Sequence, residues 1–290
     1  MAGGAAATGS PPALFVTDLD GTLLASDGRL SAWTRGALAD LLGRGCPLTY
    51  ATARSHHTAG PLLAGLPWRI PAIVSGGAFL VEPQDGRVLE SRLLSTATAA
   101  AAIAGGQRLG LAPFLIGFSG NEERIFHLPA QNPGQAAFLG ARQARGDPRL
   151  RCVATLPLPP RIVELHFMAD QAAVASLARV LNHELCGQAA MVIMEDVHHP
   201  GWFSLELSHP RATKGDMLLA LADHVGVSPR SAAVFGDNLN DLGMFAVAGW
   251  RLAVCNAHPQ VRAAADRVLA GNDADGVAAY LLDTWPTTPA

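Results

Sequence analysis

Two pairs of acidic residues, far apart in the chain, are the side chains best suited to chemistry. Asp18 and Asp20 lie two residues apart, directly after a short apolar run. Alternate side chains of an extended segment point to the same side, so these two carboxylates are expected to share one side. Asp237 and Asp241 form the second pair and also follow an apolar run. Neighbouring carboxylates that leave water are costly unless a cation or a proton balances them, so a metal or proton-transfer site is predicted.

A hydroxyl and a lysine complete the set of reactive groups. Mg²⁺ prefers hard oxygen ligands, commonly one or two carboxylates together with water and phosphate. Thr52 adds a hydroxyl and Lys214 adds a cation. Alone, Lys214 would be read as a surface residue and the acids as turn or cap residues. Together they indicate phosphoryl transfer, in which an aspartate can act as the nucleophile through an aspartyl-phosphate.

A parallel sheet is expected to position these groups. Short apolar runs, each followed at once by small or polar residues, suit strands buried on both faces; they are 13–16, 47–51, 70–74, 231–235 and 251–255. Helices are predicted between several of them, at 31–44, 213–225, 240–247 and 259–265. The repetition of strand, polar loop and helix predicts a doubly wound α/β fold of Rossmann-like type. Ligands of such sheets bind beyond the carboxyl ends of the strands, where the polar residues fall.

The middle of the chain has a different pattern and is predicted to be an inserted α+β domain. Helices are expected at 96–109, 134–144 and 171–185, and strands at 114–118, 124–128, 161–168, 190–195 and 202–207. Polar and apolar residues alternate in 162–167, as in a sheet with one face toward water. We therefore expect a disordered tail at 1–12, a core domain made of 13–82 and 209–290, and the insert at 83–208.

Composition excludes several classes of protein. Of the 290 residues, 49% are hydrophobic and 16% are charged, which excludes a disordered chain. The net charge of −3 gives no basic field for nucleic acid or anionic lipid. No stretch of about 20 apolar residues and no signal peptide is found, so a cytoplasmic protein is expected. The four cysteines lack zinc-like spacing and are expected to be reduced and mostly buried.

Four ordered motifs make the chain resemble the haloacid dehalogenase superfamily of phosphohydrolases, most closely the Cof-like subfamily with a large α/β (type C2B) cap. They are Asp-Leu-Asp-Gly-Thr at 18–22, Thr-Ala-Arg at 52–54, Thr-Lys-Gly at 213–215 and Gly-Asp-Asn-Leu-Asn-Asp at 236–241. A Leu-Glu-Leu run containing Glu206 also matches the subfamily. Ala53 and the Ser-Gly-Gly at 75–77 depart from the commoner Gly and Asn-Gly. The insert stands where the family has its cap domain.

The resemblance implies roles for the acidic residues. Asp18 would attack phosphorus, and Asp20 would protonate the leaving oxygen and then activate water. Asp18, the backbone carbonyl of Asp20 and Asp237 would bind Mg²⁺, with Asp241 supporting the metal from outside its direct ligands.

The remaining candidates would bind phosphate or meet the substrate. The phosphoryl oxygens would be bound by Thr52, the Ala53 amide, Lys214 and Asn240. Candidates for contacts with cap or substrate, chosen by location, are Arg54, His56, His57, His198 and His199. The alternative roles for these histidines are metal binding or ordinary positions in loops.

The function that follows is Mg²⁺-dependent hydrolysis of a small phosphate ester, with sugar or polyol phosphates favoured. Alternatives are a pyridoxal phosphate or flavin mononucleotide phosphatase, a phosphomutase using the same Asp18 and Asp20, or a non-catalytic ligand-binding protein. The expected partner is the small-molecule substrate, with no nucleic acid and no membrane, in a monomer or homodimer.

Overall fold

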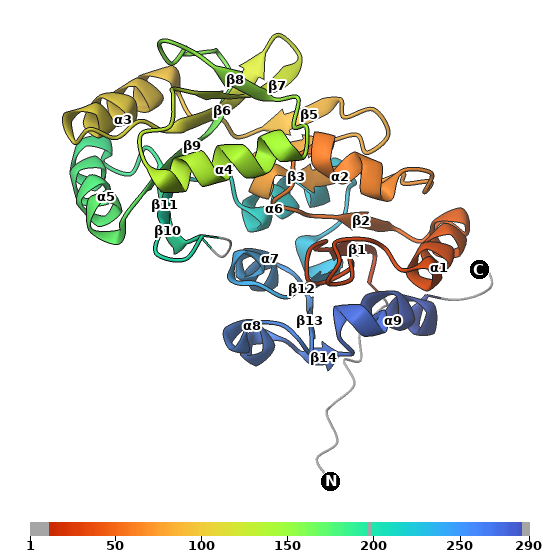
Figure 1. Ribbon diagram of the computed structural model, residues 1–290. Helices are drawn as coiled ribbons and strands as arrows, with labels where there is room; N and C mark the ends of the chain where they lie inside the picture. The colour runs from red at the N-terminus through yellow and green to blue at the C-terminus, as the bar shows by residue number, and fades with distance from the viewer. Residues whose placement is uncertain (1–11, 197–198, 286–290) are drawn as a thin grey trace. The chain divides into compact units, whose positions relative to one another are not determined.

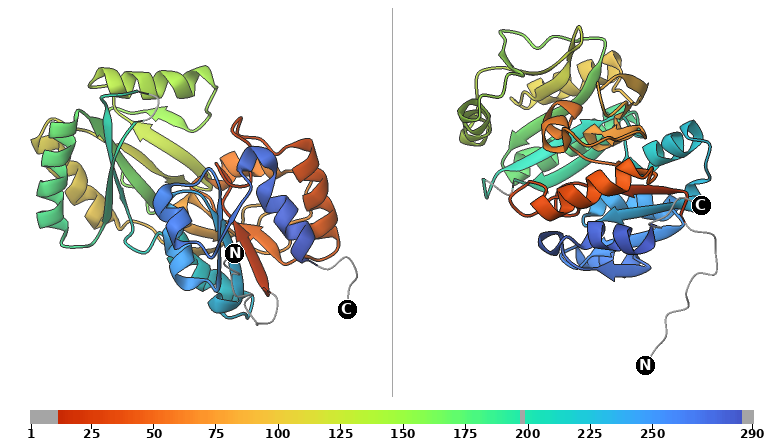
Figure 2. Two further views of the ribbon diagram at one scale, coloured as in Figure 1. Left: turned by 90° about the horizontal axis from the view of Figure 1, so that it is seen from below. Right: turned by 90° about the vertical axis from the view of Figure 1, so that its right-hand side faces the viewer.

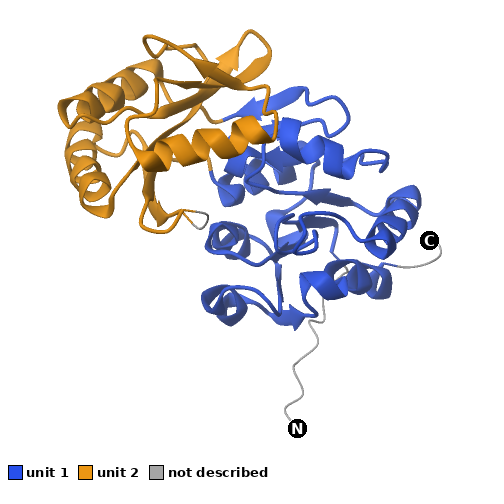
Figure 3. Ribbon diagram, in the orientation of Figure 1, with its two compact units in different colours: residues 1–91, 213–290 blue, residues 92–212 orange. Residues whose placement is uncertain are grey.

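The computed structural model describes residues 12–196 and 199–285 of the chain (Figure 1). The predicted tail at 1–12 therefore lies outside the described residues, apart from Pro12. The chain divides into two compact units (Figure 3). Unit 1 comprises Met1–Ser91 and Thr213–Ala290, and unit 2 is the insert Arg92–Ala212.

A parallel sheet is the centre of unit 1. Within the described residues it has five strands in the order β14-β13-β12-β1-β2. They are β1 (Leu14–Thr17), β2 (Leu48–Tyr50), β12 (Ala232–Gly236), β13 (Trp250–Val254) and β14 (Arg267–Leu269). β1, β2 and β12 are buried along their whole length, as expected for strands covered on both faces. β1 pairs directly with β12, and Thr17 lies opposite Phe235.

Helices cover both faces of this sheet. They are α1 (Ala32–Gly43), α2 (His56–Leu63), α6 (Lys214–His224), α7 (Leu242–Val247), α8 (Pro259–Ala264) and α9 (Gly276–Thr284). α1 packs against α9, whereas α7 packs against α6 and α8, and the two groups lie on opposite sides of the sheet (Figure 2). Short 3-10 turns are η1 (Ser75–Gly77), η2 (Pro229–Ser231), η3 (Leu239–Asp241) and η4 (Asn272–Ala274).

One predicted strand belongs to another sheet. Residues 70–74 were expected in the parallel sheet, but β3 (Ala72–Val74) pairs antiparallel with β4 (Phe79–Val81), which pairs with β5 (Val88–Ser91). The link to the main sheet is a single bridge between Ala51 and Ile73. Because β4 and β5 pair back onto β3, the insert begins at Arg92 in the structure instead of at residue 83, and it ends at Ala212 instead of 208.

Unit 2 is built on a mixed, mostly antiparallel sheet. In the described part its order is β10-β11-β9-β6-β7-β8. The strands are β6 (Phe114–Ser119), β7 (Glu122–His127), β8 (Leu150–Cys152), β9 (Ile162–Ala169), β10 (Ala190–Glu195) and β11 (Phe203–Ser208). α3 (Thr96–Arg108) and α5 (Gln171–Leu185) pack on one face over Leu165, Phe167 and Leu205.

The other face of this sheet is partly covered by α4 (Pro133–Ala144). A second apolar cluster there includes Phe114, Phe138 and Met168. The prediction of one face toward water for 162–167 is therefore wrong at His166, which is only 8% exposed.

Most predicted helices and strands are found within two residues of their expected ends. Elements that the sequence reading did not include are α2, α9, β4, β5, β8 and β14. The four cysteines are free, but only Cys46 is buried, so the expectation of mostly buried thiols is wrong. Among the described residues, no helix is both long enough and apolar enough to cross a membrane.

Candidate active site

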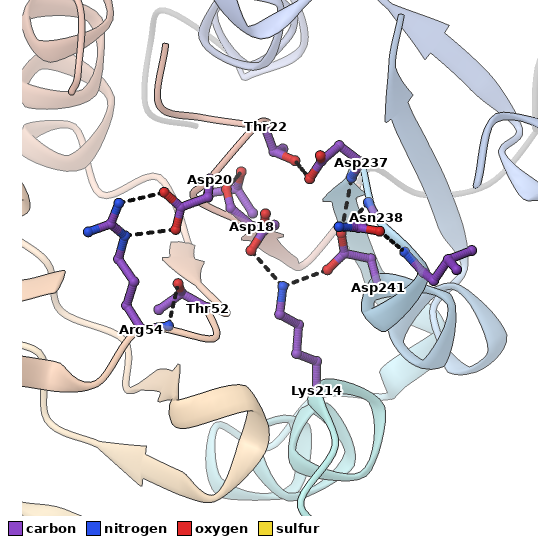
Figure 4. Close-up of polar contacts among 11 residues, drawn as sticks. Asp18, Asp20, Thr22, Thr52, Arg54, Lys214, Asp237, Asn238 and Asp241 are labelled. Atoms are coloured by element: carbon purple, nitrogen blue, oxygen red, sulfur yellow. Dashed lines mark hydrogen bonds and ion pairs between the residues drawn. The ribbon is translucent and has the colours of Figure 1, made fainter. Parts of the chain in front are cut away.

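The two acidic pairs converge because β1 and β12 are neighbours in the parallel sheet. Both strands run in the same direction and end at the same edge. The backbone N–H of Asp18 donates to the carbonyl of Phe235 at 3.0 Å, which joins the first residue after β1 to β12. Asp18, Asp237 and Asp241 therefore meet at the carboxyl edge of the sheet (Figure 4).

Lys214 joins the two acidic motifs. Its Nζ lies 2.5 Å from Oδ1 of Asp18 and 2.7 Å from Oδ1 of Asp241 (Figure 4). All three side chains are buried. Burial raises the pKa of Asp18 well above its usual range; Lys214 opposes this rise and Asp241 adds to it. Burial alone would lower the pKa of Lys214, but the two carboxylates outweigh it and raise that pKa. The lysine is therefore held as a cation between two acids.

The start of α6 fixes the position of this lysine. The Thr213 hydroxyl caps the helix by accepting the N–H of Asp216 at 3.0 Å, and Lys214 is the first helical residue. Gly77 has a φ of +103°, and a Cβ there would lie 2.2 Å from the Thr213 carbonyl oxygen. Only glycine allows the Ser-Gly-Gly turn to pack this closely against the helix start.

Asp237 is held by the first motif. The Thr22 hydroxyl donates to its Oδ1 at 2.9 Å (Figure 4). Gly21 has a φ of +76°, and a Cβ there would lie 2.4 Å from Oδ2 of Asp237. Burial raises the pKa of Asp237, partly opposed by the hydrogen bond from Thr22. Glycine in the first motif thus lets its turn contact the carboxylate of the fourth motif directly.

Hydrogen bonds to the Asp241 carboxylate hold the loop that carries Asp237 in place. Its Oδ2 accepts the N–H groups of Asp237 at 3.0 Å and Asn238 at 3.1 Å, while Oδ1 accepts from Lys214. Its carboxylate therefore already has three donors. These bonds hold the neighbouring backbone and Lys214 in place, and the role of Asp241 in supporting the metal stays a prediction.

Arg54 lies against Asp20. Its Nε donates to Oδ2 at 2.7 Å and its Nη2 donates to Oδ1 at 2.6 Å (Figure 4). The Arg54 backbone N–H donates to the Thr52 hydroxyl at 3.1 Å, so the second motif also orders this arginine. The sequence reading expected Arg54 to meet the cap or the substrate and missed this ion pair with Asp20.

The acidic cluster fits a divalent cation. Asp18, Asp237 and Asp241 each offer an oxygen within 4.8 Å of the others. These are hard donors, as Mg²⁺ requires. Three carboxylates meet the single cation Lys214, and burial raises the pKa of Asp18 and of Asp237. The donor set and the excess of negative charge both suit a metal ion.

The other phosphate-binding candidates lie on loops of unit 1. Thr52 is fully buried after β2, and Ala53 beside it is exposed. Asn240 is exposed on η3. Asn240 directly precedes Asp241 in the chain, and the phosphate-binding roles of all three residues stay predictions.

The histidine candidates divide between the two units. His56 and His57 begin α2 and line a cavity of about 420 Å³ with Tyr50 and Gln84. Burial lowers the pKa of His56, and the nearby carboxylate of Asp85 opposes this change. In unit 2, Nδ1 of His199 lies 3.1 Å from Oδ1 of Asp196. His198 lies outside the described residues.

Two signals in the sequence were missed. Asn256 donates from Nδ2 to the Gly21 carbonyl at 2.7 Å, and the His258 N–H donates to the Asp237 carbonyl at 2.7 Å. Both follow β13 in a polar cluster that had no assigned role.

The second missed signal is Lys214 itself. It is the only lysine of the chain, because the other 20 of its 21 lysine and arginine residues are arginines. The presence of a single lysine in the chain could have marked this position.

Comparisons with known proteins agree with this geometry. A family profile described as haloacid dehalogenase-like hydrolase matches residues 15–281. The chain is 28% identical to an HMP-PP phosphatase from Cronobacter sakazakii, covering 94% of this chain and 95% of that protein. It is 25% identical to a 5-amino-6-(5-phospho-D-ribitylamino)uracil phosphatase from Bacillus subtilis, covering 94% and 97%.

A shorter sequence match and a solved structure agree with the same family. Over 82 residues the chain is 40% identical to a Haemophilus influenzae protein named as a phosphatase, but it spans only 31% of that protein's length. A crystal structure of a haloacid dehalogenase-like hydrolase from Bacteroides thetaiotaomicron superposes with a TM-score of 0.75 at 22% identity, covering 93% and 98% of the two chains. The chain therefore belongs to the haloacid dehalogenase-like hydrolases and is one of their phosphatases.

Proposed function

We propose that the chain is a Mg²⁺-dependent phosphomonoester hydrolase that acts on a small phosphorylated metabolite through an aspartyl-phosphate. The observation that carries this proposal is the buried contact between Asp18 and Lys214, with Asp237 beside it. Lys214 neutralises part of the charge that would repel an anionic substrate from the Asp18 carboxylate. The carboxylate can then approach phosphorus as a nucleophile.

The proposed reaction has two steps. In the first, an oxygen of Asp18 forms a bond to phosphorus while the bond to the leaving oxygen breaks, and Asp20 gives that oxygen a proton. In the second, Asp20 takes a proton from water, the water oxygen bonds to phosphorus, and the bond to Asp18 breaks. Phosphate leaves and Asp18 is restored. Arg54 orients the Asp20 carboxylate through its two hydrogen bonds.

Other residues would bind the metal and the phosphoryl group. Mg²⁺ would be held by the carboxylates of Asp18 and Asp237 and the backbone carbonyl of Asp20, where it would neutralise phosphoryl charge. Thr52, the Ala53 amide, Lys214 and Asn240 would donate to the phosphoryl oxygens. Unit 2 would serve as the cap domain. Candidates for selecting the substrate are His56 and His57 of unit 1 and His198 and His199 of unit 2, whereas Arg54 is paired with Asp20.

A sugar or polyol phosphate is the favoured substrate class. The Bacillus subtilis relative is named for a phosphoribityl compound, in which the phosphate is carried on a polyol chain. The named relatives differ in substrate, so a pyridoxal phosphate or flavin mononucleotide phosphatase remains the second choice. We place the enzyme in the cytoplasm as a monomer or homodimer.

The test is hydrolysis of an aryl phosphate by the wild-type protein and an Asp18→Asn variant. We expect free phosphate release that stops when a chelator removes Mg²⁺. We expect Asp18→Asn to lower turnover about 10⁴-fold or more, since it removes the nucleophile. Asp27→Asn, an exposed acid near the same motif, is the matched control and should keep full activity.

Two results would contradict the proposal. Unchanged turnover in Asp18→Asn would exclude the aspartyl-phosphate. Return of the phosphoryl group to the substrate, without free phosphate, would instead identify a phosphomutase.

A further inference from the structure

A second set of metal-binding side chains lies in unit 2, on the sheet face that α4 partly covers. Glu164 and His166 lie two residues apart on β9 and so point to the same face. Glu206 on β11 lies directly opposite His166 in the antiparallel pairing. Each of the three offers a ligand atom within 4.8 Å of the other two. The cluster uses no residue of the proposed catalytic site.

His166 supplies an independent observation that points to a ligand. Its side chain is only 8% exposed, and its Nε2 is buried without a hydrogen-bond partner among the described residues. The rings of Phe138 and Phe114 lie edge-on to the imidazole, with centroids 5.1 Å and 5.7 Å away. A buried nitrogen without a partner is destabilising, so a group that binds it would remove this cost.

The two glutamates also lack a counter-charge in contact. Neither forms an ion pair with any residue in the described ranges. Arg142 is the neighbouring cation, but its guanidinium lies 3.7 Å above the Phe138 ring. Glu164 and Glu206 each offer an oxygen within 4.8 Å of the other. Two acids this close, without a paired base, are balanced either by a shared proton or by a bound cation.

We propose that Glu164, His166 and Glu206 bind one Zn²⁺ ion. Zinc accepts imidazole nitrogen together with carboxylate oxygen, whereas Mg²⁺ and Ca²⁺ take oxygen ligands. Bonds of about 2.1 Å in a tetrahedron place ligand atoms about 3.4 Å apart. The ligand atoms of the three side chains lie within 4.8 Å of one another, so each distance needs to shorten by no more than about 1.4 Å. Three protein ligands leave the fourth position open to water or to a small anion.

Calorimetric titration of the full-length protein with Zn²⁺ tests the proposal, and excess Mg²⁺ is added to compete for the acids of unit 1. We expect one equivalent of Zn²⁺ to bind. Replacing a direct ligand should weaken binding at least about 100-fold, so His166→Gln and Glu206→Gln should each do so. His183→Gln, which changes an exposed histidine of α5, is the matched control and should bind as the wild type does.

Two outcomes would overturn the proposal. One is no Zn²⁺ binding by the wild type, which would leave the shared proton as the explanation. The other is equal affinity in folded His166→Gln and Glu206→Gln variants.

A second test needs no variant. It is X-ray absorption spectroscopy of the wild-type protein loaded with one equivalent of zinc. We expect only nitrogen and oxygen neighbours at about 2.0–2.1 Å, with scattering from an imidazole ring. A sulfur neighbour at about 2.3 Å would assign the ion to the exposed cysteines and would contradict the site.

Discussion

Arg54 and Asp20 form a two-pronged ion pair in which both carboxylate oxygens accept a hydrogen bond, at 2.6 Å and 2.7 Å. Asp20 is exposed, so without the arginine its side chain would have several orientations. The planar guanidinium restricts it to one, because it binds both oxygens at once. Arg54 is thus a positioning residue for the proposed acid and base.

Replacing Arg54 by lysine should slow the reaction. Lysine keeps the charge but cannot bind both oxygens in a fixed plane. We expect kcat to fall about 10- to 100-fold through misplacement of Asp20, with a smaller change in KM. Steady-state kinetics on an aryl phosphate measure this. Arg44→Lys, in a similar surface pair with Asp40, is the control. Equal kcat for Arg54→Lys and wild type would show that the pair does not position Asp20.

Lys214 should be essential for stability in the absence of metal. Lys214→Met keeps the length of the side chain but leaves Asp18 and Asp241 buried without their cation. Breaking a buried pair in this way costs about 3–5 kcal/mol in the free energy of unfolding, measured by urea denaturation. Adding Asp18→Asn to this variant should restore part of the loss. A single variant as stable as the wild type would contradict the charge balance described above.

Lysine at this position should not be replaceable by arginine. The site is buried, with Lys214 only 2% exposed, and a guanidinium is larger than an ammonium group. We expect Lys214→Arg to lose at least about 10²-fold in kcat because it displaces Asp18. Retention of wild-type kcat would show that charge alone is required.

Acid stability of unit 2 should depend on Asp147. Its carboxylate accepts from Nη2 of Arg149 at 2.7 Å, and these bonds lower its pKa. A carboxyl group whose pKa is lowered on folding stabilises the folded state at a pH above its ordinary pKa. This stability is lost as the pH falls through the lower pKa of the folded state. Asp147→Asn should therefore reduce the free energy of unfolding by about 1.5–3 kcal/mol at neutral pH.

This difference should shrink as the pH falls below about 4, where Asp147 is protonated first in the unfolded state and, at still lower pH, in the folded state as well. Urea denaturation across this pH range measures it, with the exposed Asp223→Asn as control. A difference that stays constant with pH would mean that the ion pair is not its cause.

The thiols should divide into two classes. Burial raises the pKa of Cys46 to about 12, whereas Cys152, Cys186 and Cys255 are exposed. Because the thiolate is the reactive form, a thiol reagent at pH near 8 should modify three cysteines in the folded protein. All four should react in denaturant, and three in a denatured Cys46→Ala variant. Rapid reaction of a fourth thiol in the folded protein would show that Cys46 is accessible.

The sequence by itself determined the chemistry and the local elements. Periodic apolar residues placed α5 at 171–185 and β10 at 190–195, where the structure has them. The residue types of Asp18, Asp237 and Lys214 indicated phosphoryl transfer before any fold was known. These features depend on neighbours along the chain, which a sequence displays directly.

Only the tertiary structure decided which distant residues meet. Strand order places β1 beside β12, although more than 200 residues separate Asp18 from Asp237. Pairing also put β3 into the small antiparallel sheet and aligned Glu206 with His166. The ion pair between Arg54 and Asp20 is likewise a contact between distant residues that only the tertiary structure shows. Such contacts arise from long-range pairing and packing, and local patterns do not encode them, since several strand orders bury the same apolar runs.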